Sequence, residues 1–89
     1  MPHKKEDILK KYIALLNAYI ENNHLRHTPE RVIILTEICN LRRFTMAELQ
    51  TAISPHTISR ATVYNTLTLL EKANIILRNH HSEKIIAQC

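Results

Sequence analysis

The sequence predicts a mainly α-helical domain with a small β-hairpin, arranged as a winged helix-turn-helix of four helices and a two-stranded wing. Three observations predict it. Apolar residues recur at three- and four-residue steps in separate segments, capping residues and breaks divide those segments, and two short apolar runs flank a polar stretch near the end. Because 89 residues suffice for only one hydrophobic core, we expect one winged-helix domain over residues 1–89.

The first two helices are predicted by their apolar stripes. We expect the first over Glu6–Asn23, with a stripe made of Ile8, Leu9, Tyr12, Ile13, Leu16, Tyr19 and Ile20. The second is expected over Pro29–Asn40, because Thr28 can cap it and proline fits the first helical position. Its buried stripe is predicted to be Val32, Leu35, Ile38 and Cys39. A short extended connector, Arg42–Phe44, follows.

Capping residues then predict two further helices. Thr45 and Glu48 fit a capping box, which starts a third helix at Met46 that ends near Ile53. After a break at Ser54–Thr57, Ile58 is expected to anchor the turn to the core, and Ser59 to cap a fourth helix, Arg60–Ala73. Asn74 is expected in the left-handed conformation that often ends a helix. Strands 75–78 and 84–87 around the polar stretch 79–83 predict the hairpin.

The fourth helix carries the residues that favour DNA binding. Its winding predicts a buried side of Val63, Thr66, Leu67, Leu70 and Ala73, and an outward side of Arg60, Ala61, Tyr64, Asn65, Thr68 and Lys72. Arginine and asparagine can pair with base edges, and a tyrosine ring can contact a thymine methyl group. We predict that this helix enters the major groove and binds through Arg60, Ala61, Thr62, Tyr64, Asn65 and Thr68. The alternative is that Tyr64 is only half-buried against the wing.

The charge balance also favours a polyanionic partner. Twelve Lys and Arg against eight Asp and Glu give a net charge of +4 and a pI near 9.3. Arg26 and Arg31 flank the start of the second helix, where they can contact the DNA backbone or, for Arg26, the minor groove. The alternative is a solvated cluster of cations. The lysine pairs in the first helix are expected to give solubility and weak steering.

Other classes of protein are disfavoured. The chain has no glycine for a phosphate-binding loop, and no nucleophile, base and acid form a catalytic pattern, so we expect no enzyme. A metal or haem carrier that uses His80 and His81 is a weaker alternative, and no metal site within this chain is expected. Cys39 and Cys89 are expected to be unpaired thiols. Without an apolar run of about 18 residues, we expect a cytoplasmic protein that does not bind membranes.

From Leu25 to about Ala87 the sequence resembles the N-terminal domain of the ferric uptake regulator family. The segments that carry the resemblance are Leu25-Arg26-His27-Thr28-Pro29-Glu30-Arg31, Ile34-Leu35, Thr45-Met46-Ala47-Glu48-Leu49, Ser59-Arg60-Ala61-Thr62-Val63-Tyr64-Asn65-Thr66-Leu67 and Ala73-Asn74-Ile75. The resemblance implies a dimeric, metal- or redox-responsive repressor of AT-rich palindromic operators. It further implies that Tyr64 touches bases, Arg26 the minor groove and Arg31 the backbone, and that full-length members bind zinc and a regulatory metal such as iron.

The sequence departs from the family pattern in three respects. Asn65 stands where the family usually has arginine. Arg43 and Gln88 stand where many members have a histidine and a glutamate of the regulatory metal site, and neither suits that role. The family's dimerisation half is missing, so we expect a DNA-binding portion of a longer protein that is a monomer on its own, whereas the whole protein is a homodimer. The alternative function is a winged-helix protein-interaction module without specific DNA binding.

Overall fold

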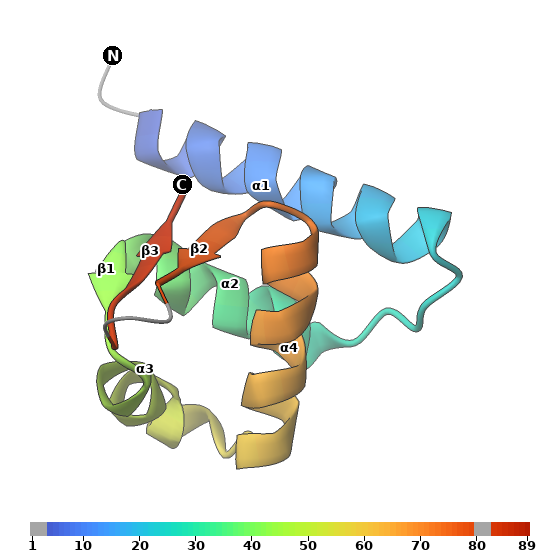
Figure 1. Ribbon diagram of the computed structural model, residues 1–89. Helices are drawn as coiled ribbons and strands as arrows, with labels where there is room; N and C mark the ends of the chain where they lie inside the picture. Colours follow the sequence, from blue (N-terminus) through green and yellow to red (C-terminus); the bar gives the residue numbers. More distant parts are fainter. Residues whose placement is uncertain (1–3, 80–82) are drawn as a thin grey trace.

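The computed structural model describes residues 4–79 and 83–89, with a small sheet at one side of the helices (Figure 1). The elements are, in order, α1 (Lys4–Asn22), α2 (Pro29–Leu41), β1 (Arg43–Phe44), α3 (Met46–Ile53), the 3-10 turn η1 (Ser54–His56), α4 (Arg60–Lys72), β2 (Ile76–Arg78) and β3 (Ile85–Ala87). Figure 1 shows α1 lying across α2 and α4, with α3 at the opposite side of the domain. The predicted helices are confirmed: α3 has the predicted bounds, and no end of the other helices differs from the prediction by more than two residues.

The sheet has three strands, whereas the sequence predicted two. The expected connector forms β1, and the strand order is β1-β3-β2. β1 pairs antiparallel with β3 in the register Arg43↔Ile86 and Phe44↔Ile85. The reason is that β3 would otherwise present an unpaired edge, and an extended segment beside it satisfies those backbone groups. β2 pairs with the other edge of β3, with Leu77 opposite Ile86.

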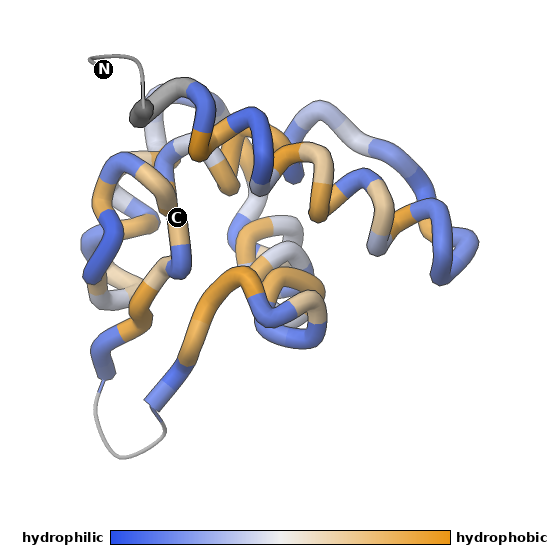
Figure 2. Tube along the Cα trace, turned by 90° about the horizontal axis from the view of Figure 1, so that it is seen from above, coloured by the Kyte–Doolittle hydropathy of each residue, from blue (hydrophilic) through white to orange (hydrophobic). Residues whose placement is uncertain are grey.

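The core is built around α2, which packs against α1, α3, α4, β1 and β3. Because neighbours surround α2, its buried face is wider than one stripe: Ile34 is buried, and the predicted Val32 is only partly buried. Figure 2 shows hydrophobic and hydrophilic positions alternating along the helices. The stripe of α1 is covered unevenly, since Leu16 is fully buried whereas Ile8 is 38% exposed. Fully buried side chains from the other elements include Leu35, Ile38, Phe44, Leu49, Val63, Leu67, Leu70 and Ile76.

Local hydrogen bonds set where α3 and α4 begin. The Glu48 amide donates to Thr45 Oγ1 at 3.2 Å and the Thr45 amide donates to Glu48 Oε1 at 2.8 Å, which confirms the predicted capping box. The Thr62 amide donates to Ser59 Oγ at 3.2 Å, which confirms that Ser59 caps α4. At α2 the prediction is wrong, because the Thr28 side chain makes no capping hydrogen bond.

Left-handed residues end several segments without glycine. Asn74 has φ 63°, as predicted, and His24, Arg42 and Thr57 have φ values of 57°, 67° and 54°. Asparagine tolerates this region, whereas a β-branched residue such as Thr57 is strained there. Thr57 lies in the turn between η1 and α4, and the next residue, Ile58, packs against the core as predicted.

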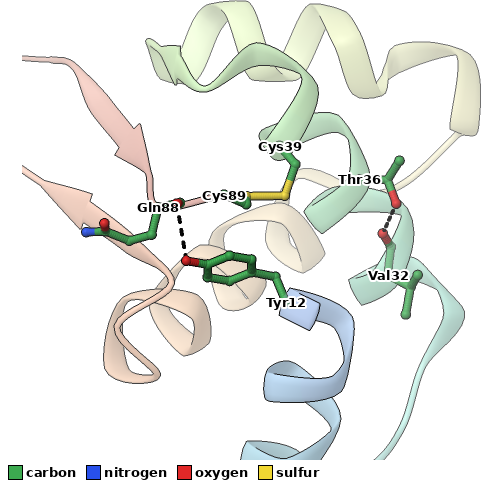
Figure 3. Close-up of a disulfide and its surroundings, with 6 residues drawn as sticks. All are labelled: Tyr12, Val32, Thr36, Cys39, Gln88 and Cys89. Carbon is green, nitrogen blue, oxygen red and sulfur yellow. Dashed lines mark hydrogen bonds between the residues drawn. A yellow bond between two sulfur atoms is a disulfide. The ribbon is translucent and has the colours of Figure 1, made fainter. Parts of the chain in front are cut away.

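Cys39 and Cys89 form a disulfide, so the prediction of unpaired thiols is wrong. Their Cα atoms are 5.3 Å apart although 50 positions separate them in sequence. The sheet brings them together: the Ala87 amide donates to the Arg42 carbonyl at 2.7 Å and the Gln88 amide to the Ile75 carbonyl at 2.9 Å. Figure 3 shows Cys89 meeting Cys39 on α2, beside Tyr12, whose hydroxyl donates to the Gln88 carbonyl at 3.2 Å.

Candidate nucleic-acid interface

One side of α4 is exposed along its whole length. The exposed residues are Arg60, Ala61, Tyr64, Asn65, Thr68 and Lys72, as the winding of the helix predicted. Tyr64 is 43% exposed, so its ring is accessible from solvent. The opposite side packs into the core through Val63, Thr66, Leu67, Leu69 and Leu70, and Ala73 is partly buried. The division between the two sides of α4 is confirmed, whereas the DNA-binding role of its exposed residues stays a prediction.

Two residues of the predicted site have hydroxyl groups that are engaged within α4. Thr62 is half-buried, and its Oγ1 lies 2.8 Å from Ser59 Oγ. Thr68 Oγ1 donates to the Tyr64 carbonyl at 3.1 Å. By contrast, Arg60, Tyr64 and Asn65 make no side-chain hydrogen bond or ion pair with other residues in the described part of the chain. Among the predicted site residues of α4, these three therefore have polar side-chain groups available to a ligand.

The start of α2 lies beside α4 (Figure 1). Arg31 is partly buried there, and its Nη1 donates to the Arg26 carbonyl, while the Arg26 side chain is exposed. Arg31 and Asn65 together line two adjacent grooves between the start of α2 and α4. The structure thus places Arg31 beside the exposed side of α4, and the Arg26 carbonyl accepts a hydrogen bond from Arg31.

The two grooves differ in charge. The first, which we name the α1–α4 groove, is lined by the end of α1 and its following loop together with Arg31, Asn65, Thr68 and Lys72. The second is lined by Thr28, Glu30, Arg31, Thr62, Asn65 and Thr66, and so includes a carboxylate. Helical winding predicts Lys72 on the outward side of α4, but periodicity does not show which other segment a helix faces, so the sequence does not place Lys72 in the site.

A contact outside α4 holds the turn that precedes it. His56 Nε2 lies 3.1 Å from Glu37 Oε2, which joins η1 to α2. Both side chains are partly exposed, so this contact adds little to stability but restricts the turn. No pattern in the sequence predicts this pair, since its members belong to different helical segments.

Hydrophobic side chains lie on the outer face of the wing. Leu77 of β2 and Ile86 of β3 face each other across the strands, and they are 54% and 39% exposed. His80 and His81, which carry the metal- or haem-carrier alternative, lie outside the described residues.

The described residues do not fit a metal centre. Over residues 4–79 and 83–89, no group of three or more His, Cys, Asp or Glu side chains could hold a metal ion. Arg43 is a cation, Gln88 is a weak ligand, and both are exposed. The sulfur atoms of Cys39 and Cys89 form a disulfide, so neither supplies a thiolate ligand. In the same part of the chain, no helix is long and apolar enough to cross a membrane.

A short helix, a turn, a second helix with an exposed polar side and a terminal pair of strands together define the winged helix-turn-helix class. Proteins of this class that bind DNA place the second helix of the motif, here α4, in the major groove. Residues 22–86 match the ferric uptake regulator family, and the chain belongs to this family. Its members are DNA-binding, metal-responsive transcription regulators and not enzymes. Neither the curated proteins nor the solved structures include a match.

Proposed function

We propose that this chain is the sequence-specific DNA-binding domain of a repressor, and that α4 reads the major groove of an AT-rich palindromic operator. The observation that carries the proposal is the set of unengaged polar side chains on the first two turns of α4: Arg60, Tyr64 and Asn65. Arginine and asparagine can pair with base edges, and the tyrosine ring can pack on a thymine methyl group. Ala61 leaves room for close approach of the backbone to the bases.

The segment before α2 has a second role in this proposal. Arg26 is exposed in the loop before α2, from which it reaches the minor groove next to the major groove that α4 occupies. Arg31 and Thr62 are partly buried, and the Thr68 hydroxyl is bonded to the Tyr64 carbonyl, so these three residues contact the DNA backbone or set the position of α4. In the whole regulator, two such domains in a homodimer would read the two halves of the operator.

The regulatory metal belongs to this proposal only at the level of the whole protein. We infer that zinc and a regulatory metal such as iron, where the longer regulator binds them, use residues other than the described ones of this chain. The reason is the unsuitable donor set at Arg43 and Gln88. We further propose that the regulator acts in the cytoplasm, on DNA that is present there.

The test is a binding titration with two labelled duplexes, one an AT-rich palindrome and one of scrambled sequence. We expect the wild type to prefer the palindrome, and Tyr64→Ala and Asn65→Ala each to reduce that preference by about 5- to 150-fold, which corresponds to roughly 1–3 kcal/mol per base contact. Lys10→Ala, an exposed change on α1, serves as the matched control and should leave the preference intact.

The alternative is a winged-helix module that binds another protein. The exposed pair Leu77 and Ile86 favours it, because neighbouring apolar side chains on a surface often mark a protein contact. The same titration separates the two functions. Equal affinity for both duplexes, unchanged by Tyr64→Ala, would remove the DNA-binding proposal and support the interaction module.

A further inference from the structure

The α1–α4 groove is rich in groups that bind anions. Arg31 and Lys72 supply two positive charges to its lining, and Asn65 supplies an amide. No carboxylate is among its described lining residues, in contrast to the neighbouring groove, which contains Glu30. Glu21, near the end of α1, is not among these lining residues. Its Oε2 lies 3.5 Å from Nε2 of His27.

The groove lies between the two elements that the proposed function places on DNA. On one side is the loop that carries Arg26, and on the other is the exposed side of α4. Arg31 connects them, since it donates to the Arg26 carbonyl and lines the groove together with Asn65.

In B-form DNA the major groove and the adjacent minor groove are separated by one sugar-phosphate strand. A protein with one element in each of these grooves must therefore pass over that strand. In this domain the surface between the two elements is the α1–α4 groove. Its positive lining is complementary to the negative charge of the strand that would occupy it.

We propose that the α1–α4 groove holds a phosphate of the DNA strand between the two grooves, and that Lys72 is a further DNA-contacting residue. This inference rests on the proposed function. Lys72 provides a mobile ammonium group at the last turn of α4, seven residues after Asn65 and on the same side of the helix. Arg31 adds a second charge while it holds the loop that carries Arg26.

The experiment measures binding of the whole chain to the palindromic and scrambled duplexes over a range of salt concentrations. We expect Lys72→Gln to lower the affinity for both duplexes by the same factor, about tenfold, because a phosphate contact carries no base information. The slope of log affinity against log salt should fall by about one unit. Lys72→Arg keeps the charge and should retain both affinity and slope, and Lys10→Gln in the first half of α1 is the matched control.

A second measurement locates the phosphate. Duplexes that carry one neutral methylphosphonate at successive positions remove one charge at a time. We expect one position at which neutralisation weakens the wild type but has no further effect on Lys72→Gln. Because Lys72 is exposed, its replacement should not disturb the core, and we expect Lys72→Gln to have the same thermal midpoint as the wild type. An equal midpoint shows that the variant is folded.

The outcomes separate the two proposals. If the wild type prefers the palindrome but Lys72→Gln behaves like Lys10→Gln, with an unchanged salt slope, the groove assignment is overturned and the proposed function stands. If Lys72→Gln changes only the preference between duplexes, Lys72 contacts bases and the phosphate assignment is again wrong. If the wild type has no preference and Tyr64→Ala has no effect, both proposals fail.

Discussion

Reduction of the Cys39–Cys89 disulfide should destabilise the domain strongly. The bond closes a loop with a sequence separation of 50, which contains α3, α4 and all three strands of the sheet. In the unfolded chain, a cross-link over such a loop removes conformational entropy equivalent to about 4 kcal/mol at 25 °C. The total stability of a small domain is about 5–15 kcal/mol, so a large part of it is expected to depend on this bond.

The reduced protein should nevertheless keep its fold. β3 stays paired with β1 and β2 on both edges, and backbone hydrogen bonds hold Ala87 and Gln88 at Arg42 and Ile75. We therefore expect the loss to appear mainly as a lower thermal midpoint, by roughly 15–30 °C for a domain of this size.

The assay is thermal and urea unfolding followed by circular dichroism, with and without a phosphine reductant. Cys89→Ser is the control: its midpoint should equal that of the reduced wild type and should not respond to the reductant. Cys89 is preferred to Cys39 for this change because Cys39 is buried in the core. Equal midpoints for wild type with its disulfide intact and reduced would refute the reasoning, and two titratable thiols in the unreduced native protein would refute the disulfide.

Three further predictions concern the turn, the loop and the oligomeric state. Thr57→Gly should raise the free energy of unfolding by about 1 kcal/mol in urea titrations, because glycine relieves the left-handed strain of a β-branched residue; an unchanged or lower value would contradict this. Arg26→Ala should weaken binding to the palindrome and to a scrambled duplex of the same base composition equally, because a minor-groove contact distinguishes A·T from G·C pairs but not their order, and it should lower the salt slope by about one unit; a change in specificity alone would show that Arg26 reads the operator sequence. Sedimentation equilibrium at micromolar concentration should find this chain monomeric, since the domain itself buries Leu16 and Ile20 of the α1 stripe; a stable dimer abolished by Ile8→Glu would place an interface on α1.

Local features of the fold and of the candidate site could be predicted from the order of residues alone. The helices, the Thr45–Glu48 capping box, the Ser59 cap and the left-handed Asn74 depend on interactions within a few residues, so the sequence pattern contains them. The exposed side of α4 follows from helical winding for the same reason. The resemblance of the residues around Tyr64 to the family predicted DNA binding, which helical periodicity alone does not indicate.

The pairing of distant segments was decided only by the tertiary structure. The third strand, the Cys39–Cys89 bond and the groove that joins Arg31 to Asn65 and Lys72 each bring together residues far apart in the chain. Such contacts form when α2 packs against its neighbours and β3 pairs between β1 and β2, which closes long loops in the chain. No short-range pattern in the sequence shows which distant residues these loops bring together. The burial of Ile34 in place of Val32 has the same origin, since a helix surrounded by neighbours on several sides buries more than the stripe its periodicity predicts.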